Sequence, residues 1–575
     1  MNKKIGAFIT CVILTALAFS DGVPFAMEYV DSPPLANVIV AKVGSVKSGP
    51  RVQVPIITWG GDVATIVANG NSKITTPNSI FARKNLNIKL VREDDFKKQI
   101  AAYIKGESPY LRGTLGMIDM AAELLSRDPA TKPVIIYLLT WSTGGDSLVV
   151  KSGIDSVHQL KGKTIAVQAY GPHVSLITEV LRDANLSIKD INLKWTSDLT
   201  GTENTPMKAL YSQDVDAATV ITPDAMTLTS QGKVGTGTEG SVKGARILFS
   251  TKTATRIIAD VYAVRADYLK NHRREVQAFV HSLMLATEEL EDLQSAREGP
   301  KQKEYKDAIT AAAEILLDSP QASADVEGLL GDCEFVGYKG NVRFFTDVAF
   351  QRGLEKLNEA IQTDLAALNL ISKKTELEKA NWQYNDFKDG LRRMFAVEAE
   401  KFDPEKVKEL ETKIRHGKVG EGLFTFSILF LPNQDTFSSD MYGEQFSKAL
   451  KLAATYGGAI ITVEGHSDPL QYLLQKKEGA PEAVVKQLRD ATRELSRQRA
   501  VSVRDSLINF AKEKGLEIDA SQFAVVGQGI DKPKSGMCGL DPCPPKDERQ
   551  WKENMRVDFQ LRQVETEAPM FKKLN

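Results

Sequence analysis

The sequence has few of the residues on which catalytic and metal centres depend. Its 575 residues include four cysteines and six histidines, and it contains no His-Glu-x-x-His, Gly-x-Ser-x-Gly or paired-carboxylate setting. Lysine and arginine number 73 against 74 aspartate and glutamate, a formal net charge of −1, so the basic excess typical of nucleic-acid binding is missing as well. We therefore expect no enzyme, no nucleic-acid partner, no cofactor and no metal site.

Long apolar runs are also missing, except for one at the start of the chain. Met1 to Lys4 is basic and Ile5 to Phe19 is apolar, which predicts a secretory signal over residues 1–20 and a periplasmic protein. The run is short for a membrane-spanning helix. An uncleaved inner-membrane anchor is the alternative.

Export permits disulfide bonds, although cysteine is scarce. Cys538 and Cys543 stand in a Gly/Pro-rich loop, where we predict a bridge rather than a zinc site, and Cys333 is expected to be a buried free thiol. Residues 21–50, with their Pro-Pro and Gly-Pro pieces, are predicted to form an exposed linker.

What the chain does contain is enough apolar sequence for several domains, with 42% hydrophobic and 26% charged residues. From residue 51 to about 416 the pattern of strand, polar loop and helix predicts an α/β fold with a parallel sheet. Two apolar strands, over residues 52–57 and 133–139, both end in Thr-Trp followed by a Gly-Gly-Asp step. Ligands of open α/β sheets bind beyond the carboxyl ends of strands, so both ends are predicted to face a pocket.

The residues of these two strand ends also have structural interpretations. Asp62 and Asp146 are equally well explained as helix caps. Trp59 and Trp141 either sandwich a flat part of a ligand or belong to a core.

Three further pieces extend the pattern: Leu160 to Val167, Asp214 to Ala218, and Ser142 to Val149. Together they resemble periplasmic substrate-binding proteins of the nitrate/sulfonate/taurine and thiamine-precursor type. The resemblance implies a bilobal fold, with lobe one over residues 51–150 and 258–416, lobe two over 151–257, and a solute between the lobes.

The helix start at Tyr170-Gly171-Pro172 favours an anionic group, and the solute is expected to be a small organic anion or zwitterion. His173 is expected to be a polar wall, because no partner carboxylate is apparent. The helical stretch 350–416 is expected to pack on lobe one rather than form a stalk. The predicted solute-binding residues are Trp59, Gly60, Gly61, Asp62, Trp141, Ser142, Thr143, Asp146, Tyr170, Gly171, His173 and Asp216.

The most specific pattern lies near the end of the chain. An alternating apolar run from Ala459 ends in Gly-His-Ser-Asp over residues 465–468, and Leu-Ser-Arg-Gln-Arg-Ala follows over 495–500. The first piece predicts a strand. The second predicts a helix with Ser496 as N-cap, which puts Arg499 in the first turn.

These pieces resemble the OmpA-like peptidoglycan-binding domain, over residues 417–563, with a tail over 564–575. The resemblance implies that Asp468 and Arg499 hold the zwitterionic end of a diaminopimelate side chain, a carboxylate for its ammonium and a guanidinium for its carboxylate. The implied peptidoglycan-binding residues are His466, Asp468, Thr492, Leu495, Arg499, Asn554 and Arg556.

The chain departs from that family in three places. Thr492 replaces an asparagine, Asn554-Met555-Arg556-Val557 replaces Asn-Arg-Arg-Val, and Asp468 and Arg499 stand 31 positions apart, about twice the usual spacing. The charged insert near residues 476–490 is expected to be an exposed loop, which adds little closure entropy.

The sequence thus predicts an exported solute-binding protein of the ABC-transporter type, anchored to peptidoglycan, with an inner-membrane permease as a further implied partner. The alternative is a structural or sensory wall protein whose bilobal domain docks a protein partner.

Overall fold

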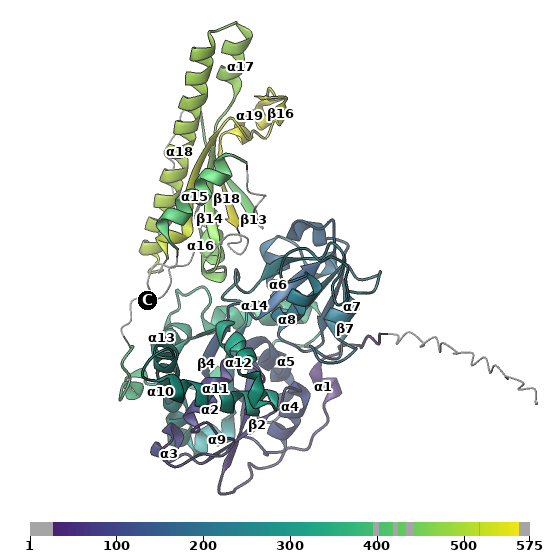
Figure 1. The fold of residues 1–575 in the computed structure, drawn as a ribbon, viewed down its shortest axis with the longest axis vertical. Helices are drawn as coiled ribbons and strands as arrows, with labels where there is room; N and C mark the ends of the chain where they lie inside the picture. Colours follow the sequence, from purple (N-terminus) through teal and green to yellow (C-terminus); the bar gives the residue numbers. More distant parts are fainter. Residues whose placement is uncertain are drawn as a thin grey trace, which may run out of the picture.

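The computed structural model describes residues 27–394, 402–417, 422, 424–432, 442–516 and 518–562. The predicted signal and the tail over 564–575 lie outside this part. Two α/β lobes and a C-terminal domain make up the described chain, and the C-terminal domain stands above the lobes in Figure 1. Within the described ranges, no helix is long and apolar enough to cross a membrane.

Lobe one is built around a mixed sheet in the order β11-β4-β10-β3, with β12 beside β4 and a separate parallel pair β1-β2. All ten residues of β4 are buried, because helices cover both faces of this apolar run. Its strands are β1 (Val52–Ile56), β2 (Ile88–Arg92), β3 (Tyr110–Thr114), β4 (Pro133–Ser142), β10 (Ala259–Arg265), β11 (Cys333–Phe335) and β12 (Glu378–Lys379). Its helices are α2 (Asp62–Ala68), α3 (Ile80–Arg83), α4 (Phe96–Ile104), α5 (Leu115–Leu125), α9 (Ala266–Asn271), α10 (Arg273–Ser295), α11 (Gln302–Leu317), α12 (Ser323–Gly331), α13 (Gly337–Thr346) and α14 (Leu354–Ala367).

Lobe two has one five-stranded sheet in the order β7-β6-β8-β5-β9. Its elements are β5 (Asp146–Val150), β6 (Thr164–Gln168), β7 (Asn192–Thr196), β8 (Ala217–Ile221), β9 (Arg246–Ser250), α6 (His173–Asp183), α7 (Pro206–Ala209) and α8 (Thr222–Leu228). The predicted boundary at residue 150 is wrong, because β5 pairs with β8 and β9. The chain therefore crosses between the lobes at residues 143–145 and again at 251–258, which we call the hinge segment.

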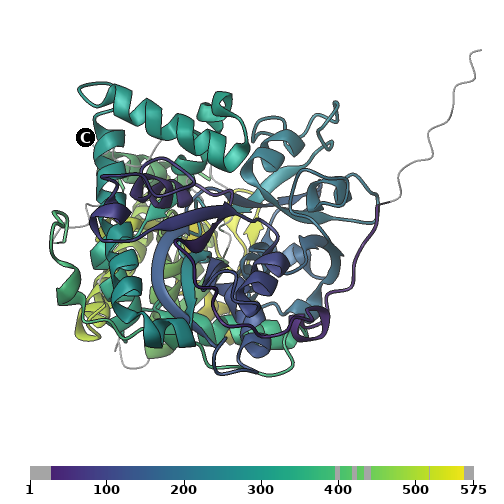
Figure 2. The same ribbon diagram turned by 90° about the horizontal axis from the view of Figure 1, so that it is seen from below.

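Residues 27–50, predicted to form an exposed linker, are exposed or half-buried except at Leu35, but they contact both lobes, and we call them the strap (Figure 2). The Val30 amide donates to the Trp195 carbonyl of lobe two. Farther along, α1 (Leu35–Val38) packs against α5 of lobe one, with Leu35 fully buried. The Gly44 amide donates to the Ile104 carbonyl. Residues before Pro33 thus contact lobe two, and residues after Pro34 contact lobe one.

The C-terminal domain has a four-stranded sheet in the order β13-β18-β14-β15, with a short hairpin β16-β17. Its strands are β13 (Phe424–Leu429), β14 (Ile460–His466), β15 (Phe523–Gly529), β16 (Met537–Cys538), β17 (Asp541–Pro542) and β18 (Arg556–Arg562), and its helices are α15 (Pro404–Arg415), α16 (Gly443–Thr455), α17 (Leu470–Lys477), α18 (Glu482–Glu513) and α19 (Glu548–Asn554). Helix α14 packs against lobe one, as predicted. Helix α15 instead packs on Ile460 and Val526 of the C-terminal sheet, so this domain starts at Phe402 rather than at residue 417.

Helix α18 corrects the prediction for the charged insert. The insert is helical: α17 and the first half of α18 form a hairpin that projects from the domain (Figure 1). Ser496 is therefore internal to a helix and is no N-cap. Its hydroxyl instead accepts a hydrogen bond from the Gly529 amide at 2.9 Å. A Cβ at Gly465 would lie 1.8 Å from the Ser496 carbonyl oxygen, so glycine in β14 lets α18 approach the sheet.

Candidate functional sites

The two tryptophans predicted to sandwich a ligand have different environments. Trp141 is 3% exposed, with its ring edge-on to Phe344 at 6.0 Å and under the Arg256 guanidinium at 5.6 Å. It is a core residue of lobe one, so its predicted place in an interlobe pocket is wrong. Trp59 is half-buried, and its indole N–H donates to Thr140 Oγ1 at 3.1 Å.

The indole of Trp59 lies against the first crossing between the lobes. A Cβ at Gly145 would lie 2.5 Å from the ring, so a side chain at that position would displace the indole. The Gly-Gly step therefore lets the crossing segment contact Trp59 of lobe one. Gly60 serves packing within lobe one, because a Cβ there would lie 2.1 Å from the Leu329 carbonyl oxygen.

Asp62 does not face a ligand either. Its side chain is fully buried and pairs with Arg112 at 2.8 Å, and Arg112 also pairs with Asp260 at 3.0 Å. Burial raises the pKa of Asp62 to about 7, against the lowering effect of Arg112. This cluster joins α2, β3 and β10 inside lobe one. Asp62 therefore has neither of its two predicted roles, helix cap or ligand contact.

A chain of hydrogen bonds connects the ends of β4, β5 and α6. Ser142 Oγ donates to Asp146 Oδ2 at 2.6 Å, and His173 Nε2 lies 2.7 Å from Asp146 Oδ1. His173 therefore does have a partner carboxylate, one that lies 27 positions away in sequence. Ser142 lies in lobe one and the other two residues lie in lobe two, so the chain spans the lobe junction.

Other predicted solute-binding residues divide between the junction and the far end of lobe two. Tyr170 adopts φ 61° and its hydroxyl donates to the Pro33 carbonyl of the strap at 2.6 Å. Gly171 lies beside it, fully buried. Asp216 accepts from the Thr164 amide at 2.9 Å, at the amino ends of β6 and β8. Tyr170 lies at the carboxyl end of β6, so the structure separates Asp216 from the rest of the set.

Two acidic residues at the junction were missed by the sequence reasoning. The Asp332 carbonyl accepts from the Thr143 amide at 2.8 Å, and burial raises the pKa of the Asp332 carboxyl to about 6, with Lys252 opposing. Asp224, near the start of α8, has a buried Oδ2 with no hydrogen-bond partner among the described residues. His173 Nδ1 is also buried without one. Neither acid belongs to a recognisable motif, so only the fold could reveal them.

The residues predicted to bind peptidoglycan converge at the end of β14. The Arg499 guanidinium is 1% exposed and donates to the His466 carbonyl at 3.3 Å, two residues before Asp468. Asp468 Oδ2 accepts from the Leu470 amide at 3.2 Å, and its Oδ1 is buried with no hydrogen-bond partner in the described structure. Burial raises the pKa of Asp468, and the nearby Trp551 indole and the Leu470 amide oppose the rise.

His466 and Arg556 belong to a supporting ion-pair cluster on the sheet. His466 Nε2 lies 3.2 Å from Asp558 Oδ2, and Arg556 Nε lies 2.9 Å from the same oxygen. Burial lowers the pKa of His466. Thr492 contributes its carbonyl, which accepts from Ser467 Oγ at 2.9 Å, and Leu495 lies half-buried on the same helix.

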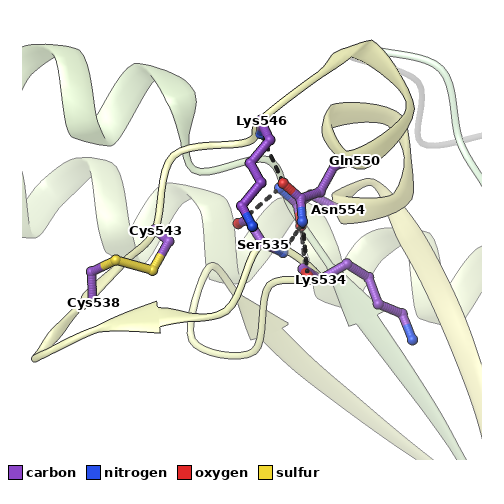
Figure 3. The surroundings of a disulfide bond; sticks show 7 residues. All are labelled: Lys534, Ser535, Cys538, Cys543, Lys546, Gln550 and Asn554. Atoms are coloured by element: carbon purple, nitrogen blue, oxygen red, sulfur yellow. Dashed lines mark hydrogen bonds between the residues drawn. A yellow bond between two sulfur atoms is a disulfide. The ribbon is translucent and has the colours of Figure 1, made fainter.

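Asn554 holds the disulfide loop (Figure 3). Its Oδ1 accepts from the Lys534 amide at 2.7 Å, and Cys538 and Cys543 are joined in a disulfide within this loop. The loop is also tied to α17, because Tyr472 OH donates to Asp541 at 2.8 Å. Asn554 is fully buried, so its side chain supports the loop and does not reach a ligand at the surface.

A cavity of about 730 Å³ is lined by Trp141 and by none of the other predicted site residues. Lobe one contributes Trp141 and Phe344 to its wall, the hinge segment contributes Arg256, and the C-terminal domain contributes Leu450 and Ile518. It is an interdomain space, not an interlobe cleft. In the described ranges, no group of three or more His, Cys, Asp or Glu residues is arranged to hold a metal ion.

The architecture of residues 51–394 is that of a bilobal α/β protein whose lobes are joined by two crossing segments. The sequence model of the NMT1/THI5-like family matches residues 75–292, which run from lobe one through lobe two and back. No curated protein matches the chain.

Several solved binding proteins are similar in structure. The alkanesulfonate-binding protein SsuA of Xanthomonas axonopodis pv. citri, bound to MOPS, is 18% identical, covering 57% of this chain and 97% of its own, with a TM-score of 0.37. The aliphatic sulphonate binding protein SsuA of Escherichia coli is 15% identical, covering 62% and 98%, with a TM-score of 0.39. The nitrate-binding protein NrtA of Synechocystis PCC 6803 is 11% identical, covering 58% and 94%, with a TM-score of 0.35.

Proposed function

We propose that the protein is an exported solute-binding protein of the ABC-importer type whose C-terminal domain attaches it to peptidoglycan. The bilobal architecture and the NMT1/THI5-like match over residues 75–292 support the first half. The contacts around Asp468 and Arg499 support the second half. A permease in the inner membrane would be the partner that receives the solute.

The solute would be a small organic anion or zwitterion held at the start of α6. This helix begins without a side-chain cap, so its first-turn amides can bind a negative group. His173 Nδ1, which is buried and has no hydrogen-bond partner among the described residues, would supply a polar contact there, and Asp224 lies close enough to His173 for the two to interact electrostatically. Trp141 and Asp62 are left out of this site because their side chains contact lobe-one residues, Trp141 against Phe344 and Asp62 with Arg112.

Mass spectrometry of small molecules released from the denatured full-length protein tests this assignment. We expect one stoichiometric anion or zwitterion, or a rise in melting temperature with a member of a panel of such compounds. His173→Gln should abolish the rise, whereas His158→Gln, at an exposed position of the same lobe, should not. If no compound is retained and none raises the melting temperature, the solute-binding proposal fails.

The wall attachment is carried by one observation: Arg499 donates to the His466 carbonyl at the end of β14, and the Asp468 carboxylate follows two residues later. A carboxylate and a guanidinium complement the ammonium and carboxylate of a free amino-acid end. Losing either partner leaves a ligand charge unpaired, which costs about 2–5 kcal/mol.

Co-sedimentation of the full-length protein with purified diaminopimelate-type peptidoglycan tests the attachment. Asp468→Ala and Arg499→Ala should each abolish retention. The matched controls Arg497→Ala and Asp505→Asn, at exposed positions of α18, should be retained like the wild type. Retention of both site variants at the wild-type level would contradict the assignment.

A second candidate function is docking of a protein partner by the bilobal domain. It is favoured by the burial of Trp141, which removes one of the predicted ligand-stacking surfaces. A protein that releases no small molecule on denaturation, yet captures a defined envelope protein, would have this function.

A further inference from the structure

The turn that follows α16 in the C-terminal domain lies directly on the hinge segment of the bilobal domain. The Arg256 amide donates to the Thr455 carbonyl at 3.1 Å, and the Gly458 amide donates to the Thr253 carbonyl at 3.1 Å. A Cβ at Gly458 would lie 1.7 Å from the Lys252 carbonyl oxygen. This approach therefore requires glycine, and two backbone hydrogen bonds fix the turn against the segment between the lobes.

Side chains from the same region reach α6 of lobe two. The fully buried Tyr456 donates its hydroxyl to Asp183 Oδ2 at 2.8 Å, and its ring meets Phe249 edge-on at 5.8 Å. Lys451 Nζ lies 2.6 Å from Asp183 Oδ1 and 2.9 Å from Glu179 Oε1. The C-terminal domain thus contacts both the hinge segment and the lobe that must move about it.

Lobe one completes the same cluster through Arg352. Arg352 Nη1 lies 3.2 Å from Glu179 Oε2, and its Nε donates to the Arg256 carbonyl at 2.7 Å. Burial disfavours the charged carboxylate, but Arg352, Lys451 and Arg182 together hold the pKa of Glu179 well below its ordinary value. Three bodies therefore share one buried carboxylate: lobe two supplies it, and lobe one and the C-terminal domain supply cations.

We propose that the C-terminal domain is a hinge brace that holds the two lobes in the arrangement seen in this structure. Lobe opening rotates α6 relative to Arg352 and the hinge segment, because bilobal closure is a rotation about the crossing segments. That rotation must separate Glu179 from one of its cations, and an unpaired buried charge is strongly unfavourable. Docking of the C-terminal domain and closure of the lobes therefore favour each other, and by linkage the effect is reciprocal.

If the protein binds a solute and peptidoglycan as proposed, the brace couples solute capture to wall attachment. This coupling rests on the proposed function, but the brace does not. Strain on the C-terminal domain that undocks its α16 turn would loosen the lobes. The brace itself is a property of the ligand-free chain, so it is tested without solute or peptidoglycan.

The test measures two distances between spin labels in the full-length, ligand-free protein by pulsed electron–electron double resonance. Spin labels at Lys89 and Gln213, exposed on lobes one and two, report the interlobe distance, and labels at Lys89 and Lys512 report docking. Cys11→Ser and Cys333→Ser remove the two cysteines outside the disulfide, and the disulfide stays intact. The brace-breaking variant is Gly458→Val, which obstructs the turn without altering either lobe.

In the wild type both distributions should be narrow. In Gly458→Val both should broaden and shift to longer distances, whereas Gly443→Val, at a glycine of α16 with open space around it, should match the wild type. Lys451→Glu should give the same result as Gly458→Val and guards against a folding defect in that variant. A docking distance that broadens while the interlobe distance stays narrow would overturn the proposal, as would no change in either.

Discussion

The junction between the lobes and the end of β14 were both expected to present polar side chains to a ligand, and they differ in how those side chains are used. At the junction, both oxygens of Asp146 are bonded, to Ser142 and to His173. At the end of β14, one oxygen of Asp468 accepts an amide and the other has no partner in the described structure. Both carboxylate oxygens of Asp146 are thus used in contacts at the lobe junction, whereas the Asp468 carboxylate has an oxygen that could bind a ligand.

The largest expected effect separates the two tryptophans of the junction. Trp141→Ala should lower the free energy of unfolding of the ligand-free protein by about 3–5 kcal/mol, because it empties a core position between Phe344 and Arg256. Thermal and urea unfolding measure the loss. Unchanged stability together with lost solute affinity would return Trp141 to the pocket and weaken the contrast between the two sites.

The disulfide loop tests how the C-terminal site is supported. Replacing Cys538 and Cys543 by serine should destabilise the loop by about 2 kcal/mol, from loop-closure entropy. Hydrogen exchange should show faster opening of residues 533–546, with exchange in the lobes unchanged. The control is Cys333→Ser, a free thiol in lobe one. An unchanged loop would mean that the contacts of Asn554 and Tyr472 suffice to hold it.

The sequence shows which residues come together at the end of β14 more readily than which residues meet between the lobes, for a physical reason. Gly465 to Asp468 and Leu495 to Arg499 are short motifs, and each stays within one element and its next turn. The residues that meet between the lobes come from segments as distant as His173 and Asp332. No local pattern shows that Asp146 finds His173, or that an Asp332 carbonyl accepts from Thr143.

The element boundaries failed where tertiary contacts decide them. The pattern of apolar residues does not show that β5 belongs to lobe two, because β4 and β5 are both buried strands. The strap has the composition of a linker, yet Leu35 is buried in the core of lobe one. Ser496 has the chemistry of an N-cap, but α17 and the Arg489 and Arg493 pairs with Asp531 carry the helix past it.

A smaller effect concerns the acid that the sequence did not reveal. The pKa of Asp332 is raised to about 6, so the folded protein binds a proton that the unfolded chain releases near pH 4. Its contribution to stability is present at low pH and is lost as the pH rises from about 4 to about 6. The full shift corresponds to roughly 3 kcal/mol, and solvent screening of this partly exposed group reduces it to about 1–2 kcal/mol.

Asp332→Asn should therefore flatten the fall in stability between pH 4 and 6 by that amount. Unfolding of the ligand-free protein across this range measures it. Asp325→Asn, at an exposed position of the preceding helix, should keep the wild-type profile. Identical profiles for all three proteins would show that Asp332 is solvated like an ordinary surface carboxylate.

The smallest expected change in stability tests whether Trp59 only supports the lobe junction or also contacts a solute. Trp59→Phe keeps an aromatic ring against Gly145 but removes the indole N–H that donates to Thr140. A hydrogen bond of this kind contributes about 1 kcal/mol, and Thr140 keeps its bond to Asp260. We expect a loss of about 1 kcal/mol in stability, and Thr140→Val in the Trp59→Phe background should add less than it does alone, because both changes remove the same bond.

If Trp59 also lines the solute site, calorimetric affinity for the retained solute will fall in Trp59→Phe and not in Thr140→Val. A stability loss as large as that of Trp141→Ala would place both tryptophans in the core and leave the interlobe region without an aromatic contact for a solute.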